Sequence, residues 1–141
     1  MVDKELVSRK LSQIRMYVDQ LRRAEDINWE KYRSDLRARA FVERYIHLAI
    51  EEVLDVANYL VSFYRWREPT SFRDLFSILR EHDIIPEDHL LTFQRMASFR
   101  NMLVHRYESI DDEVVFGIFN KHLSDFDLFI RLVTDWSGDH F

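Results

Sequence analysis

The chain of 141 residues is 47% hydrophobic and 32% charged, a mixture typical of a globular protein and not of a disordered one. It has no cysteine, which excludes disulfides and thiolate metal sites, and no run of about 18 apolar residues that could span a membrane. Its formal net charge of −5 argues against a protein that coats nucleic acid through bulk electrostatics.

The first two thirds of the sequence predict three helices. Apolar residues recur at three-to-five residue spacings from Lys4 to Arg23, which indicates an amphipathic helix. After a polar break at 26–28, a long helix is expected from Ser34 or Asp35 to Trp66. Pro69 prevents its continuation, and Thr70 or Ser71 is a suitable N-cap for a third helix over Phe72–Glu81.

Two more helices are expected in the remainder. Pro86 opens a fourth helix with a broad apolar surface from Leu90 to Val104, and Ile110-Asp111-Asp112 predicts a turn and cap before the last one. Only two glycines and two prolines occur in the whole chain, which favours long helices over the tight turns of a β-fold. The predicted fold class is therefore all-α: an up-and-down bundle of about five helices in a single domain over residues 1–141.

The sequence also suggests a compartment. The absence of cysteine fits a reducing environment, and the first five residues carry charges of both signs without the apolar core of a secretory signal. We therefore expect a cytoplasmic protein without membrane attachment. Seven basic residues between Arg22 and Arg44 could form a local basic surface or be ordinary solvated side chains, and both interpretations stay open.

The best candidates for catalytic residues lie near the end of the fourth predicted helix. His105 can exchange a proton with a ribose hydroxyl or a leaving oxygen near neutral pH, and the guanidinium of Arg100 can bind a phosphate in two places. Asn101 could orient the imidazole or bind the phosphate. On an ideal helix Arg100 lies about 140° from His105, so the two converge only if a partner chain supplies the other wall or the helix ends near Val104. Spacing alone also fits ordinary capping and interface contacts.

The same residues resemble a known family. The stretch Phe99-Arg100-Asn101-Met102-Leu103-Val104-His105-Arg106-Tyr107 resembles the signature of the HEPN superfamily, an arginine and a polar residue followed by a spacer and a histidine. The tyrosine two residues beyond the histidine resembles the HepT-like toxin branch. The likeness extends over the long central helix (residues 43–58) and the middle connection (69–76). Asn58 departs from it, because relatives often carry a histidine there.

The resemblance implies a function and a mechanism. Members are helical bundles that dimerise with two signature helices facing one cleft, and active members are metal-independent ribonucleases. Arg100 and His105 would be catalytic, Asn101 supporting, and no metal ion or other cofactor would be required. The chain would be the toxin of a type II/VII-like toxin–antitoxin pair. It would cleave RNA, either tRNA or mRNA, by attack of a 2′-hydroxyl on the adjacent phosphate. A minimal nucleotidyltransferase antitoxin would neutralise it by attaching AMP to Tyr107.

Two alternatives are weighed against this reading. Glu43, His47, Glu51 and Asp55 recur every four residues and could belong to a metal-binding bundle, but di-iron bundles pair Glu with a His three residues on, and no second copy occurs here. A polar flank packed near the cleft is the better interpretation. The alternative function is a non-catalytic helical module that binds a nucleotide or a nucleotidyltransferase, with Arg100 and His105 in a dimer interface.

Overall fold

A computed structural model describes residues 1–105 and 110–141 of the protein. Seven α-helices and one short 3-10 helix occur in these two ranges, and no β-strand does. The prediction of an all-α bundle is confirmed. Among the described helices, none qualifies as a candidate membrane span.

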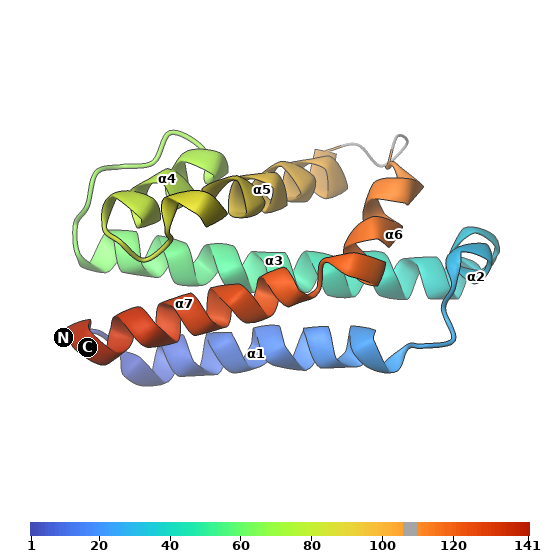
Figure 1. Ribbon diagram of the computed structural model, residues 1–141, viewed down its shortest axis with the longest axis horizontal. Helices are drawn as coiled ribbons and strands as arrows, with labels where there is room; N and C mark the ends of the chain where they lie inside the picture. Colours follow the sequence, from blue (N-terminus) through green and yellow to red (C-terminus); the bar gives the residue numbers. More distant parts are fainter. Residues whose placement is uncertain (106–109) are drawn as a thin grey trace.

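The bundle is organised around its longest helix (Figure 1). Helix α3 (Leu36–Phe63) runs the length of the molecule, with α1 (Lys4–Arg23) and α7 (Ser124–His140) along one side. Helices α4 (Phe72–Glu81) and α5 (Leu90–His105) lie along the other side. Both chain termini lie at the same end, and the short α2 (Trp29–Ser34) lies at the opposite end, near α6 (Asp112–Lys121).

Side-chain caps set the helix starts. Asp3 accepts a hydrogen bond from the Leu6 amide (3.0 Å) at α1, Asp35 from the Arg37 amide (2.9 Å) at α3, and Ser71 from the Asp74 amide (3.0 Å) at α4. The predicted bounds of α1 and α4 are confirmed.

Helix ends differ slightly from the prediction. α3 stops at Phe63 instead of Trp66, because Arg65 adopts a left-handed conformation (φ 55°) that a helix cannot include. Pro86 opens the 3-10 helix Glu87–His89, which leads into α5.

The predicted number of helices is wrong in two places. The six-residue α2 follows the polar break, and the last predicted helix is divided into α6 and α7 around His122 and Leu123. Aromatic packing gives the reason, because Phe116 of α6 packs against Trp29 of α2 with ring centroids 5.4 Å apart. α6 must therefore turn away from the axis of α7. No proline or glycine marks this break in the sequence.

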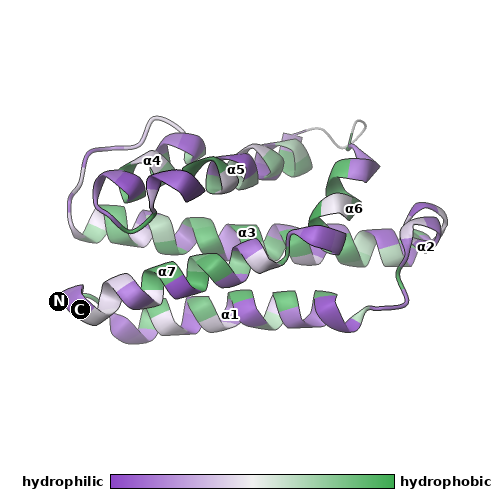
Figure 2. Ribbon diagram, in the orientation of Figure 1, coloured by the Kyte–Doolittle hydropathy of each residue, from purple (hydrophilic) through white to green (hydrophobic). Residues whose placement is uncertain are grey.

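The core forms where α4, α5 and α7 meet α3. The ring of Phe93 on α5 lies 5.6 Å from that of Phe76 on α4 and 5.7 Å from that of Phe129 on α7, and all three rings are fully buried. Figure 2 shows hydrophobic colour concentrated along α3 and the middle of α7, whereas α2 is mainly hydrophilic. Phe93 anchors the first turn of α5 in this core, and the buried Phe99 and Leu103 hold its last turns, which carry Arg100, Asn101 and His105.

Candidate active site at the end of α5

The last turns of α5 carry three of the four predicted site residues. Phe99 and Leu103 are buried and hold this part of the helix against the bundle. Arg100 is partly buried, whereas Asn101 and His105 are exposed, and His105 is the final residue of α5. Tyr107, the predicted site of AMP attachment, lies outside the described residues.

Arg100 is held in a defined orientation by α3 and α4. Its Nε donates a hydrogen bond of 2.7 Å to Oε1 of Glu51 on α3, and its Cζ lies 4.8 Å from the ring centroid of Phe72 on α4. The side chain of Arg100 is only 19% exposed. Within the described part of the chain, neither terminal nitrogen, Nη1 or Nη2, makes a hydrogen bond. These are the two donors with which a guanidinium grips a phosphate.

Glu51 joins Arg100 to a histidine. Its Oε1 also lies 3.1 Å from Nε2 of His47, one turn earlier on α3. The two residues therefore form a polar flank beside α5, as predicted.

The other two members of the row have different partners. Glu43 accepts a hydrogen bond from the buried Tyr32 (3.2 Å), and burial raises the pKa of the Glu43 carboxyl. Asp55 binds Lys10 at 3.1 Å. The four residues do not converge on one point, and the described residues contain no group of three or more His, Cys, Asp or Glu side chains able to hold a metal ion.

The start of α6 is also bound to α3. Nη1 of Arg39 on α3 donates to Asp112, the first residue of α6, at 3.1 Å, and its Cζ lies 5.4 Å from the ring centroid of Tyr32. Burial and the nearby Glu43 carboxylate raise the pKa of the Tyr32 phenol. The end of α5, through Arg100, and the start of α6, through Asp112, are therefore both bound to α3.

The structure does not bring Arg100 and His105 together within one chain. Arg100 faces α3 and α4, whereas His105 is exposed at the end of α5, and no hydrogen bond or ion pair joins them among the described residues. This arrangement agrees with the offset of about 140° expected from helix geometry.

An apolar hollow of about 730 Å³ lies beside the signature, between α5, α6 and α7. Met96, Phe99 and Met102 line it from α5, and Val114 and Ile118 line it from α6. Val114 is 45% exposed. A hydrophobic surface of this kind next to charged residues is typical of a protein–protein interface.

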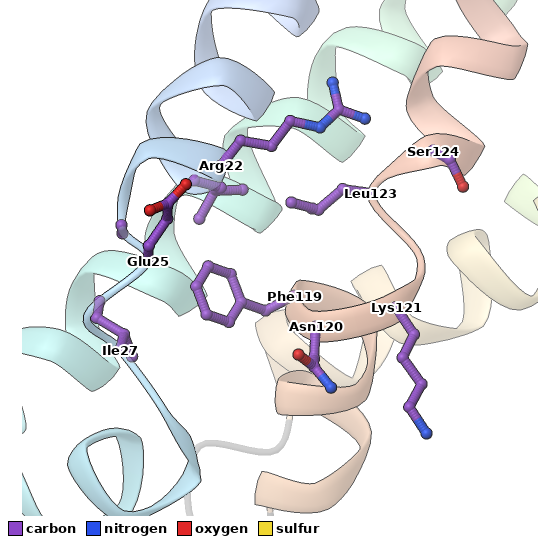
Figure 3. Close-up of a pocket in the computed structure, with 10 residues that line it drawn as sticks. Arg22, Glu25, Ile27, Phe119, Asn120, Lys121, Leu123 and Ser124 are labelled. Atoms are coloured by element: carbon purple, nitrogen blue, oxygen red, sulfur yellow. The ribbon is translucent and has the colours of Figure 1, made fainter.

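A second hollow, of about 360 Å³, lies between the end of α1 and the joint of α6 and α7 (Figure 3). Phe119 points toward Glu25 and Ile27, while Lys121 extends outward. Arg22 is paired with Asp127 on α7, a contact that raises the Arg22 pKa. This hollow contains none of the signature residues.

The sequence gives a signal for only one of the two residues that contact Arg100. Glu51 belongs to the polar row that recurs every four residues and is recognisable as part of a polar flank, but the sequence does not show that Arg100 is its partner. Phe72 carries no sequence signal, because an aromatic residue at the start of an amphipathic helix is ordinary.

The helical bundle, with Arg100, Asn101 and His105 at the end of α5, defines a HEPN-class helical protein. A model of the HepT-like family, described as ribonuclease HepT-like, matches residues 14–133. The chain belongs to this HepT-like family.

Curated relatives extend the similarity to nearly the whole chain. A tRNA nuclease HepT from Aphanizomenon flos-aquae is 22% identical over 135 residues, which cover 96% of this chain and 92% of the relative. An mRNA nuclease HepT from Shewanella oneidensis is 25% identical over 103 residues, 73% of this chain and 77% of the relative.

Solved structures share the fold. A tri-AMPylated Shewanella oneidensis HEPN toxin in complex with MNT antitoxin superposes with a TM-score of 0.84 at 22% identity, covering 96% of this chain and 99% of that chain. The cytosolic protein YutE from Bacillus subtilis gives a TM-score of 0.82 at 19% identity, covering 96% and 90%.

Proposed function

We propose that this protein is a metal-independent endoribonuclease toxin that a nucleotidyltransferase antitoxin neutralises. Membership of the HepT-like family and the names of two relatives, a tRNA nuclease and an mRNA nuclease, support the reaction class. One observation carries the proposal for this chain: Glu51 and Phe72 hold Arg100 through Nε and one face, and leave Nη1 and Nη2 for a phosphate.

The proposed reaction is an internal transfer at phosphorus. The ribose 2′-oxygen attacks the adjacent phosphorus and forms a new P–O bond, while the bond from phosphorus to the 5′-oxygen breaks. His105 accepts the proton of the 2′-hydroxyl or donates one to the leaving 5′-oxygen. Arg100 stabilises the negative charge that builds up on the phosphate, and Asn101 supports this contact. The products are a 2′,3′-cyclic phosphate and a 5′-hydroxyl.

The proposed active unit is a homodimer. Arg100 and His105 lie on different sides of α5, so one chain cannot bring its own guanidinium and imidazole to the same phosphate. A second copy packed against the end of α5, with the apolar hollow of α5 and α6 as part of the contact surface, would bring a second imidazole to the cleft that contains the guanidinium. Two histidines in one cleft can divide the proton transfers, one as base and one as acid.

AMP attachment to Tyr107 is the proposed off switch. The Tyr107 oxygen would attack the α-phosphorus of ATP, lose its proton and release pyrophosphate. The attached nucleotide adds bulk and a negative charge two residues from His105, where an RNA phosphate has to bind. The MNT antitoxin of the structural neighbour is the type of partner that would supply this activity.

The test is RNA cleavage in EDTA by purified protein whose intact mass shows no modification. We expect cleavage by the wild type and a loss of about 100-fold or more in His105→Ala and Arg100→Ala. His89→Ala and Arg131→Ala are matched controls outside the site. Products should end in a cyclic phosphate. Intact RNA with the unmodified wild type would refute the nuclease proposal and leave the binding module as the alternative.

The regulatory proposal has its own readout. Incubation with the cognate nucleotidyltransferase and ATP should add the mass of one or more adenylyl groups to the peptide that contains Tyr107. A modification that survives unchanged in Tyr107→Phe would remove this tyrosine as the acceptor.

A further inference from the structure

A third hollow, of about 270 Å³, lies beside Phe72, the residue over whose ring Arg100 lies. It is lined by Asn58 of α3, the connection residues Pro69, Thr70 and Ser71, and Phe72 and Leu75 of α4. Phe72 is shared between the two features, because Arg100 lies over its ring and the same side chain forms a wall of the hollow. Phe72 therefore connects the hollow to the guanidinium that would bind the scissile phosphate.

Helix geometry places Asn58 on the same face of α3 as Glu51. Seven residues separate them, which corresponds to almost two full turns and a rise of about 10 Å. Glu51 holds Arg100 at one end of this interval, and Asn58 faces the hollow at the other. A strand of RNA whose phosphate rests on Arg100 can lay a neighbouring base over Asn58.

The wall of the hollow is fixed before any ligand binds. Asp74 accepts hydrogen bonds from the Thr70 amide (2.9 Å) and from Nη1 of Arg67 (2.7 Å), and Arg67 also binds Glu81. The Arg67 guanidinium holds the pKa of Asp74 well below its ordinary range. This clamp ties the connection from α3 to the start of α4.

The chemistry of the lining suits a nucleobase. Pro69, Phe72 and Leu75 offer apolar surface to a flat ring, and the exposed Asn58 amide presents a donor and an acceptor side by side. An asparagine amide pairs best with adenine, through the 6-amino group and N7. The volume is near the lower limit of small-molecule pockets, about 300 Å³, and so suits one base and not a larger ligand.

We infer that this hollow is a base subsite in which Asn58 reads an unpaired adenine next to the scissile phosphate. The inference rests on the proposed ribonuclease function and adds a specificity determinant to it. It also gives Asn58 a role that the signature does not supply. Unpaired bases stacked on side chains and read along their edges are the usual basis of sequence-specific RNA recognition.

The first test maps cleavage positions in a single-stranded RNA pool with randomised bases. We expect the wild type to cut preferentially beside adenine. Asn58→Ala should reduce this preference by about fivefold or more, and Asn58→Asp should move it toward cytosine, because the carboxylate accepts a hydrogen bond that the cytosine amino group donates. Asn120→Ala makes the same chemical change outside the hollow and should keep the wild-type pattern. An unchanged pattern in both Asn58 variants, or a wild type without base preference beside the cut, would overturn the inference.

A binding measurement separates this inference from the proposed function. In a His105→Ala background, adenine oligonucleotides should bind more tightly than uracil oligonucleotides, and adding Asn58→Ala should remove the difference. If that pattern holds while the wild type does not cleave RNA, the subsite stands and the nuclease proposal fails. If cleavage depends on Arg100 but the binding preference survives Asn58→Ala, the subsite alone is refuted. Melting curves will verify folding, which the exposed Asn58 should not affect.

Discussion

Glu51→Ala offers the sharpest test of how the site is built. The substitution removes the acceptor of the 2.7 Å bond from Nε of Arg100. A hydrogen bond to a charged group contributes about 1.5–3 kcal/mol, and partial exposure of both side chains (19% for Arg100 and 35% for Glu51) favours the lower figure. About 1.5 kcal/mol corresponds to roughly a tenfold rate change. If the guanidinium is free to shift by about 1 Å, the loss in rate can reach about 100-fold.

We therefore expect kcat for RNA cleavage to fall about 10- to 100-fold in Glu51→Ala, with KM changed much less. Glu51→Gln keeps an acceptor oxygen and should recover most of the rate. Glu52→Ala is the matched control, because the Glu52 carboxylate is next to Glu51 in the chain but binds Lys10, at 3.3 Å, and not Arg100.

The readouts are initial rates over a range of RNA concentrations, with circular dichroism melting to verify the fold. A wild-type kcat in Glu51→Ala would show that Arg100 does not need this support. A higher affinity for RNA with unchanged kcat would mean that Glu51 competes with the phosphate and does not position the guanidinium. Either result would refute the positioning role.

Three further outcomes test packing, assembly and electrostatics. Phe129→Ala should lower the free energy of unfolding in urea by about 3–5 kcal/mol, because the ring is fully buried beside Phe93, and a loss below 1 kcal/mol would contradict this core. Val114→Asp should convert the proposed dimer to monomer in light scattering, whereas a dimer that persists would exclude this face. The lowered pKa of Asp74 means that its carboxylate stabilises the fold above about pH 4 and that this contribution is lost as the pH falls toward the folded-state pKa. Arg67→Ala should therefore reduce the drop in Tm between about pH 5 and pH 2, and an unchanged drop would refute the assignment.

The fold follows from the sequence wherever the signal is local. The N-caps Asp3, Asp35 and Ser71 and the breaker Pro69 act within a few residues of their own backbone, so helix starts are visible in the sequence. The division of the last predicted helix is not visible, because it depends on Phe116 packing against an aromatic residue about ninety positions earlier.

The candidate site, too, could be predicted only in part from the sequence. Arg100, Asn101, His105 and Tyr107 are identified by their order and spacing, and the resemblance to the HEPN signature gives them roles that spacing alone does not. Helix periodicity also indicates that Arg100 and His105 diverge, since it requires only the angle per residue. The location of Tyr107 stays a sequence prediction, because it lies outside the described residues.

By itself, the sequence determined the helical class, most helix starts, the family and the chemistry that the signature could perform. Only the tertiary structure decided which surfaces support that chemistry. Glu51 lies 49 residues from Arg100 in the chain, and Phe72 lies on a third helix, yet both contact the guanidinium. Such contacts depend on how α3, α4 and α5 pack, and helix periodicity places a residue on a face without specifying which face lies opposite.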